Sequence, residues 1–141
     1  MSREIIFRGK RHNGEWVEGN LFMPDLPDAP TEICIGTNVI RITYDVIPET
    51  VGQYTGLTDK NGKKIFEGDI LKLWRSVGKN VELRMKYPKP LVVEYCDLWC
   101  QFVVEDNEIK EKYGIWQDFQ AFEVIGNIHD NSLEDFKDEN A

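Results

Sequence analysis

The sequence predicts an all-β fold, a small barrel or sandwich of about eight short antiparallel strands, SH3-like or related, that ends in a short C-terminal helical turn. Three observations predict it. Asparagine–glycine pairs, which favour tight hairpin turns, separate short runs rich in β-branched and aromatic residues. Several of these runs alternate apolar and polar residues, as strands with one buried face do. No stretch keeps a helical spacing of apolar residues for more than two turns.

The first element is expected to be a β-hairpin. Glu4–Arg8 forms one strand, Glu15–Phe22 forms the return strand, and Asn13-Gly14 predicts a two-residue turn between them. Gly19 interrupts the return strand, which indicates either a bulge or a close approach by another part of the backbone.

A proline-rich loop separates this hairpin from the next one. Residues 23–30 hold three of the six prolines, and proline lacks the N–H that a strand ladder needs. The runs Glu32–Ile35 and Val39–Tyr44 lie only a few residues apart, so we expect a second hairpin. Pro48 can open one turn of helix, because its missing N–H is not needed at the first helical position.

The densest set of turn signals lies in Gln53–Trp74, which reads QYTGLTDKNGKKIFEGDILKLW. Asn61-Gly62 predicts a two-residue type I′ turn, in which both residues need positive φ. Gly68-Asp69 predicts a second turn, with the Asp69 carboxylate accepting hydrogen bonds from backbone amides. The apolar run Ile70–Trp74 follows as a mostly buried strand.

The second half of the chain alternates strands with polar connections. Residues 75–90 predict a long loop or a ragged basic hairpin, and residues 105–114 predict a loop or a short helix. Strands are expected at residues 91–96, 99–104 and 119–128. Asp97-Leu98 joins the first two of these strands. A helical turn should follow the last one, capped by Asn131 or Ser132.

All 141 residues are expected to form one domain, since a chain of this length builds a single core. We place the N-terminal hairpins at 1–52 and the barrel core at 53–130, with a variable basic loop near 75–90. Residues 131–141 form an acidic tail, whose last residues should fray.

Charge is unevenly distributed along the chain, whose formal net charge is −8. Residues 60–90 carry nine Lys or Arg against three acids, whereas residues 91–141 carry three against thirteen. One interpretation is charge complementarity within or between subunits. The other is a local nucleic-acid patch on an otherwise repellent protein. The residues that would bind nucleic acid or a partner protein are Lys60, Lys63, Lys64, Lys72, Trp74 and Arg75.

Metal, nucleophile and cofactor motifs give no catalytic prediction. The three cysteines and two histidines are scattered, whereas a structural zinc site usually takes its four ligands in close pairs. The chain has neither a Gly-x-Ser-x-Gly elbow nor a phosphate-binding glycine loop. We therefore expect no catalytic residue, no metal, no cofactor and no enzymatic activity.

An undetected enzyme remains the third hypothesis, after a binding module and a nucleic-acid-binding protein. Its candidate acid–base groups are Asp59, Glu67, Asp69 and His129. Acid–base or Mg²⁺ chemistry needs at least two such groups to converge in one pocket. A turn carboxylate that binds backbone amides is the structural alternative at the aspartates.

Membrane insertion and secretion are not expected. No apolar run approaches the roughly 18 residues of a membrane-spanning helix, and the N-terminus shows no apolar signal region. Three cysteines, an odd number, fit free thiols in a reducing cytosol.

Three segments, in order, resemble the YopX family of small bacteriophage and prophage proteins. The segment from Thr55 to Ile70 matches a TGLxDKxGxxIxEGDI-type signature, FRGKRHNGEWVEGNLF resembles the family's start, and FEVIGNIHDNSLED resembles its ending. Ser132 stands where the family usually has proline, and residues 76–89 match poorly. The resemblance implies an all-β, barrel-containing protein of the host cytoplasm that forms homo-oligomers. It supplies no activity, catalytic residue or cofactor.

The sequence thus favours a phage- or prophage-encoded accessory protein that is not an enzyme, associates with itself, and binds a host or phage protein. The alternative is a small-barrel nucleic-acid-binding protein that uses the basic 60–90 segment. An acidic chain of pI about 4.8 is the reverse of the usual electrostatic signature of such proteins, so nucleic acid is not the favoured partner.

Overall fold

The structure is a computed structural model, and it describes residues 4–23, 25–36, 41–77, 82–85, 90–106, 111–114 and 122–136. Its regular elements are β-strands, apart from the 3-10 turns Pro48–Thr50 (η1) and Leu133–Phe136 (η4). Within this part of the chain, no helix is long and apolar enough to cross a membrane. The predicted all-β class and the C-terminal helical turn are therefore confirmed.

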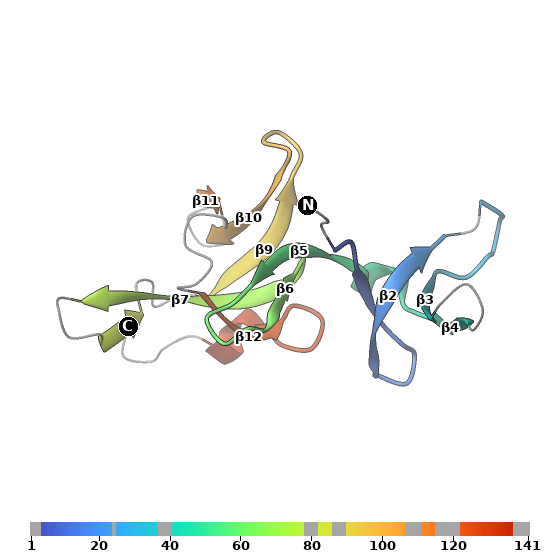
Figure 1. Ribbon diagram of the computed structural model, residues 1–141, viewed down its shortest axis with the longest axis horizontal. Coiled ribbons are helices and arrows are strands. Elements are labelled where there is room, and N and C mark those ends of the chain that lie inside the picture. The colour runs from blue at the N-terminus through green and yellow to red at the C-terminus, as the bar shows by residue number, and fades with distance from the viewer. Residues whose placement is uncertain are drawn as a thin grey trace. The chain divides into compact units, whose positions relative to one another are not determined.

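The chain folds as two compact units, residues 1–56 and residues 57–141. The first unit contains a meander of four antiparallel strands (Figure 1). These are β1 (Phe7–Lys10), β2 (Trp16–Phe22), β3 (Glu32–Gly36) and β4 (Arg41–Asp45). On its other side β1 pairs with β5 (Gly52–Thr58), which crosses the boundary between the units.

The core of the first unit is small. Val17, Ile33 and Val46 are buried together, and Phe7, Leu21, Tyr44 and Val51 pack against them while partly exposed. Gly19 on β2 lies where a Cβ atom would fall well inside van der Waals contact with the backbone carbonyl oxygen of Cys34. The close backbone approach predicted at Gly19 is therefore confirmed.

Both Asn-Gly pairs make hairpin turns, but not the predicted two-residue turns. In each loop the glycine N–H donates to the carbonyl three residues earlier, Gly14 to Arg11 and Gly62 to Asp59. The two glycines have positive φ, whereas the only described non-glycine residues with positive φ are Asp28 and Cys100. Each loop is thus a type I turn that ends in a left-handed glycine, the usual three-residue hairpin.

The second unit contains a sheet built around β7 (Asp69–Val77), with strand order β11-β10-β9-β7-β12 (Figure 1). Its other strands are β9 (Leu91–Cys96), β10 (Gln101–Asp106), β11 (Glu111–Gly114) and β12 (Phe122–Asn127). The far end of β7 pairs with β8 (Glu82–Met85) as a two-stranded ribbon. The short strand β6 (Lys64–Phe66) follows β5 through the Asn61-Gly62 turn.

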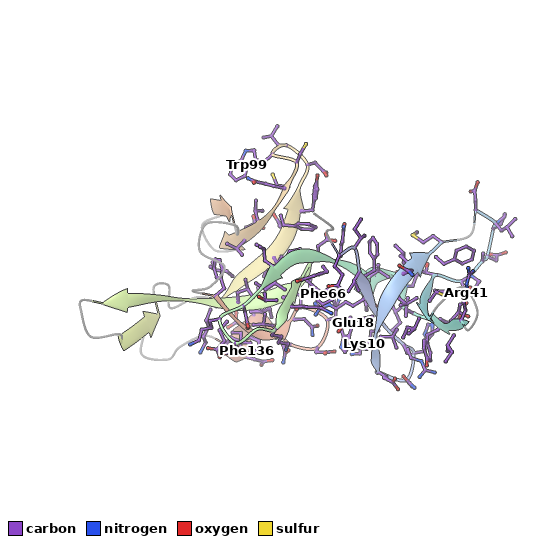
Figure 2. The ribbon with its side chains drawn as sticks, in the orientation of Figure 1. Lys10, Glu18, Arg41, Phe66, Trp99 and Phe136 are labelled. Atoms are coloured by element: carbon purple, nitrogen blue, oxygen red, sulfur yellow. The ribbon has the colours of Figure 1, made fainter. Side chains whose placement is uncertain are left out.

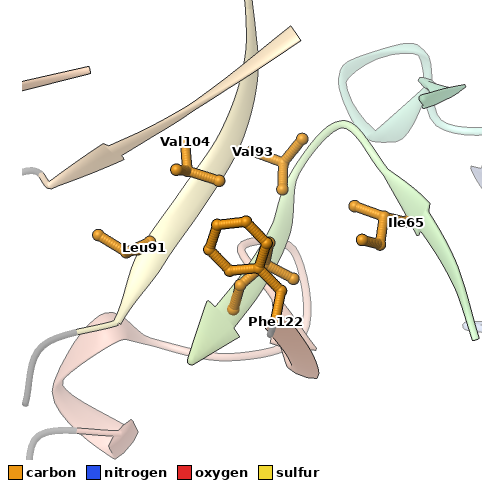
Figure 3. Packing of buried hydrophobic residues seen from close by; sticks show 6 residues of the cluster. Ile65, Leu91, Val93, Val104 and Phe122 are labelled. Atoms are coloured by element: carbon orange, nitrogen blue, oxygen red, sulfur yellow. The ribbon is translucent and has the colours of Figure 1, made fainter. Parts of the chain in front are cut away.

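One apolar cluster holds the second unit together. Phe122 of β12 lies among side chains of the central strands, and Ile65 of β6 completes the cluster (Figure 3). The fully buried members are Ile65, Leu71, Leu91, Val93, Val104 and Phe122. Burial of side chains of this size stabilises the fold by about 1.5–3 kcal/mol each.

Two further details of the predicted architecture are wrong, and one open alternative is decided. Neither sheet closes into a barrel, because closure requires the first and last strands to pair, and within the described residues the strand orders stay open. Of the two alternatives at 75–90, the basic hairpin is the one observed, because the end of β7 pairs antiparallel with β8. Part of the predicted loop or helix at 105–114 is instead β11, which pairs with β10.

Some predicted features lie outside the described residues. They are the start of the second strand of the second hairpin at 39–40, parts of the basic loop at 78–81 and 86–89, residues 119–121 of the last strand, and the end of the acidic tail at 137–141. Pro24 of the proline-rich loop also lies outside them.

Candidate functional site

The side chain of Asp59 holds the Asn61-Gly62 turn together. It is 5% exposed, and its Oδ1 accepts hydrogen bonds from the backbone N–H groups of Asn61 (2.8 Å) and Lys63 (2.9 Å). Aspartate is favoured at the first position of a type I turn because its carboxylate can accept these amides. The turn therefore depends on Asp59 as well as on the glycine.

The same carboxylate joins this turn to β12. Asp59 Oδ2 accepts the N–H of Val124 at 2.9 Å, and the N–H of Lys60 donates to the carbonyl of Phe122 at 2.9 Å. Asp59 and Lys60 thus satisfy backbone groups along the outer edge of β12, which is an end strand of its sheet. The edge of β12 is covered by the chain's own turn.

The Glu67-Gly68-Asp69 turn is fixed in a similar way. Gly68 has φ +89° and donates its N–H to the carbonyl of Val93 at 2.8 Å. Asp69 is 1% exposed, and its Oδ2 accepts the N–H of Phe66 at 2.8 Å. The predicted use of Asp69 as a backbone acceptor is confirmed.

The closing segment packs against this second turn. The N–H of Ile128 donates to the carbonyl of Gly68 at 2.9 Å, and His129 Nε2 would lie 3.4 Å from a Cβ atom added at Gly68. Gly126 leaves space for Asn131, whose Oδ1 would be 2.5 Å from a Cβ atom there. The turn at Gly68 and the closing segment at Ile128 both belong to segments that carry the family resemblance. They form one structural region, although about 60 residues of chain separate them.

The structure places three of the predicted binding lysines in one turn. Lys63 is exposed, whereas Lys60 and Lys64 are half-buried, and Lys64 begins β6. Lys60 Nζ lies 4.0 Å from Glu123 Oε2, and Glu123 is also the cross-strand partner of Lys72. Glu123 thus offsets part of the positive charge of this group.

Trp74 and Arg75, the remaining predicted binding residues, lie on β7 beyond the part that pairs with β12. There β7 pairs with β8, and Arg75 stands directly opposite Arg84. The register thus brings two basic residues of the 75–90 segment to one position of the ladder.

The candidate acid–base groups divide into two sets. Asp59 and Asp69 are buried and accept backbone amides, whereas Glu67 and His129 are half-buried. His129 lies beside the turn that contains Glu67 and Asp69, because it packs over Gly68. No cluster of three or more His, Cys, Asp or Glu side chains that could hold a metal is found among the described residues.

The sequence did not indicate the most exposed apolar feature, which is the tip of the β9–β10 hairpin. Leu98 is 87% exposed, Trp99 is 48% exposed, and Tyr95 is 42% exposed with its ring 5.3 Å from that of Phe102. Figure 2 shows Trp99 at this tip. The sequence did contain a signal for this exposed tip, because Leu98 and Trp99 are two large apolar residues in a turn, where polar residues are usual.

The comparisons with known proteins agree with this fold. The crystal structure of protein EF1440 from Enterococcus faecalis superposes with a TM-score of 0.53 at 24% identity, covering 92% of this chain and 96% of that chain. At this identity the likeness concerns the fold alone. No curated protein matches the chain. The family model described as YopX protein matches residues 7–134, and the chain therefore belongs to the YopX family.

Proposed function

We propose that this protein is a non-enzymatic interaction module that associates with itself and is encoded by a phage or prophage for action in the host cytoplasm. The observation that carries the proposal is the uncovered apolar tip formed by Leu98 and Trp99. Exposed apolar groups gathered in one place mark contact sites, and tryptophan is among the residues that contribute most to binding. A host or phage protein is a further class of partner that such a tip fits.

The position of the buried carboxylates supports a binding role over a catalytic one. Acid–base catalysis needs a carboxylate within reach of a substrate proton. Asp59 is buried and accepts three backbone N–H groups, and Asp69 is buried and accepts one from Phe66. These backbone hydrogen bonds give Asp59 and Asp69 a structural role, and no catalytic role is needed to explain why they are present.

Light scattering at micromolar concentrations tests self-association. We expect the apparent mass of the wild-type protein to rise with concentration, because burying the apolar tip removes it from water. Replacing Leu98 and Trp99 together by serine should weaken the association at least about tenfold, since two large apolar contacts are lost. Leu26→Ser, at a 69% exposed site in another loop, is the matched control.

The outcomes separate the two parts of the proposal. A wild-type protein that stays strictly monomeric would contradict self-association. Association that is unchanged by the Leu98 and Trp99 replacements would contradict a role of the tip in it.

The second candidate function is nucleic-acid binding through the basic segment at 60–90, which includes the lysines near the Asn61-Gly62 turn, Lys72 and the β7–β8 ribbon. The specific observation in its favour is the strand register, which places Arg75 directly opposite Arg84, because phosphate groups are bound by neighbouring basic residues. Two-stranded ribbons of this kind also fit the major groove of DNA.

Fluorescence anisotropy with labelled single- and double-stranded DNA tests this candidate. We expect binding at 50 mM salt to weaken steeply by 200 mM salt, because each phosphate contact releases counterions. Changing Lys60, Lys63, Lys64, Lys72 and Arg75 to glutamate should abolish the binding, whereas Lys10→Glu in the first unit should not. Absence of binding at low salt would remove nucleic acid from consideration.

A further inference from the structure

Strand β4 is an outer strand of its sheet. It pairs with β3 on one side, and no described strand pairs with its other side. Four of its five residues are exposed, and Tyr44 is half-buried. An outer strand presents a row of N–H and C=O groups that can pair with another chain.

Among the described residues, no backbone group outside β3 pairs with β4. The outer edge of β12 is covered by Asp59 and Lys60, as described above. Within β4 there is no proline and no lysine, and its two charged residues, Arg41 and Asp45, stand at opposite ends with opposite signs. Such an edge does not repel a strand with the same sequence.

The sequence of β4, Arg41-Ile42-Thr43-Tyr44-Asp45, is complementary to itself in the antiparallel direction. When two copies are centred on Thr43, Arg41 of each copy faces Asp45 of the other. Ile42 likewise faces Tyr44, and the two Thr43 residues face each other. Opposite charges, an aromatic next to a β-branched residue, and paired threonines are each favourable cross-strand combinations.

We propose that β4 pairs antiparallel with β4 of a second copy of this chain, about a two-fold axis at Thr43. This inference rests on the proposed self-association and adds a second contact surface, with a defined symmetry, to the Leu98–Trp99 tip. The β4 contact is isologous, so the same patch serves both copies and this contact by itself joins two chains. The two sheets become one continuous sheet across the contact.

The apolar side of β4 fits this arrangement. Ile42 is 51% exposed and stands opposite Ile35 of β3, which is 40% exposed, so this apolar pair reaches the outer strand without cover. In the dimer, Tyr44 of the second copy lies opposite Ile42 and covers it. Residues on directly opposite positions share a face, so the apolar pairs extend the buried side that begins at Ile33.

The C-terminal end of β4 borders a shallow hollow. Thr43, Tyr44 and Asp45 line a shallow hollow of about 400 Å³ together with Arg11, His12 and Asn13. The guanidinium of Arg11 lies 4.7 Å from the centre of the Tyr44 ring and fixes one wall of the hollow. In the proposed register, Arg41 of the second copy stands opposite Asp45, at the end of β4 that borders this hollow. Figure 2 labels Arg41 on the described copy.

The charges also select one register. A pairing centred on Arg41 or on Asp45 would place like charges directly opposite each other, which is unfavourable. Slipping the strand by one residue would move Ile42 and Tyr44 to the wrong face. Only the register centred on Thr43 places both Arg41 residues opposite Asp45.

A charge-swap experiment tests the proposal by analytical ultracentrifugation. Because of the two-fold axis, Arg41→Asp creates two Asp–Asp pairs, and Asp45→Arg creates two Arg–Arg pairs. We expect each single variant to raise the dissociation constant of the dimer at least about tenfold. The double variant R41D/D45R exchanges the charges and should restore the wild-type constant within about threefold.

Asp25→Arg is the matched control, because it makes the same charge change at an exposed loop position outside β4. It should leave the dimer unchanged. Circular dichroism verifies that the variants are folded, and hydrogen exchange at 41–45 should slow as the wild-type concentration passes the dissociation constant.

The outcomes distinguish this inference from the proposed function. A wild-type protein that associates while both single variants associate equally well would overturn the β4 contact and leave self-association standing. Failure of R41D/D45R to recover, with both single variants folded, would also overturn it. A strictly monomeric wild-type protein would overturn the proposed self-association itself.

Discussion

Asp59→Ala is expected to lower the free energy of unfolding of the unit at 57–141 by about 3–5 kcal/mol, because it removes the acceptor of three backbone N–H groups. Each amide that stays buried without a partner costs about 1–3 kcal/mol. The substitution removes the hydrogen bonds within the turn at Asn61 and also the bond that attaches this turn to Val124. Both losses destabilise the same region of the unit.

Urea denaturation followed by circular dichroism measures this effect. Asp97→Ala, which removes an exposed carboxylate at a hairpin tip, is the matched control and should change stability by less than about 0.5 kcal/mol. Asp59→Asn should fall between the two, since its amide oxygen can still accept the N–H groups of Asn61 and Lys63 while its NH₂ group opposes that of Val124. Equal stability of the alanine variants at 59 and 97 would contradict the assigned role.

Gly19→Ala is expected to have the second largest effect, a loss of about 2–4 kcal/mol in the first unit. The added methyl group would overlap the carbonyl oxygen of Cys34. A backbone atom in a paired strand cannot rotate away as the end of a side chain can, so β2 and β3 must separate locally. The pairing of Asn20 with Cys34 would be lost first.

Hydrogen exchange locates this damage. Amides at 32–36 should exchange faster in Gly19→Ala, whereas those at 122–127 should keep their wild-type rates. Asn20→Ala, at the adjacent exposed position on β2, is the control and should leave both segments unchanged. Wild-type exchange at 32–36 in Gly19→Ala would show that the strands tolerate the methyl group.

Local signals in the sequence predicted most of the strands and hairpins, and the errors have physical causes. Asn61-Gly62 favours a type I′ turn when considered alone, but Asp59 precedes it, and aspartate favours a type I turn, in which its carboxylate accepts the amides of Asn61 and Lys63. At the first hairpin the pair's own asparagine contributes, since Asn13 Oδ1 accepts the N–H of Glu15 at 3.0 Å. At Asn61-Gly62 a residue outside the pair is involved in the turn.

The long-range features were beyond what local patterns can predict. Nothing in the spacing of residues near Asp59 indicates that its carboxylate accepts the N–H of Val124. Closure of a barrel likewise depends on whether the first and last strands of a sheet pair, which local patterns do not show. The candidate lysines were identified from charge alone, so the compensating position of Glu123 was missed. Leu98 and Trp99 were missed because a turn pattern predicts conformation and not exposure.

The bond between Asp59 and Val124 spans 65 positions of sequence, and this distance has a consequence for synthesis. At roughly 5–20 residues per second, the ribosome needs about 3–13 seconds to deliver the partner of Asp59 after Asp59 itself. The strands β1 to β4 pair with sequence neighbours and can form while the nascent chain is still growing. For those seconds Asp59 and its turn are open to chaperones and proteases, although Asp59 is buried once the last strand arrives.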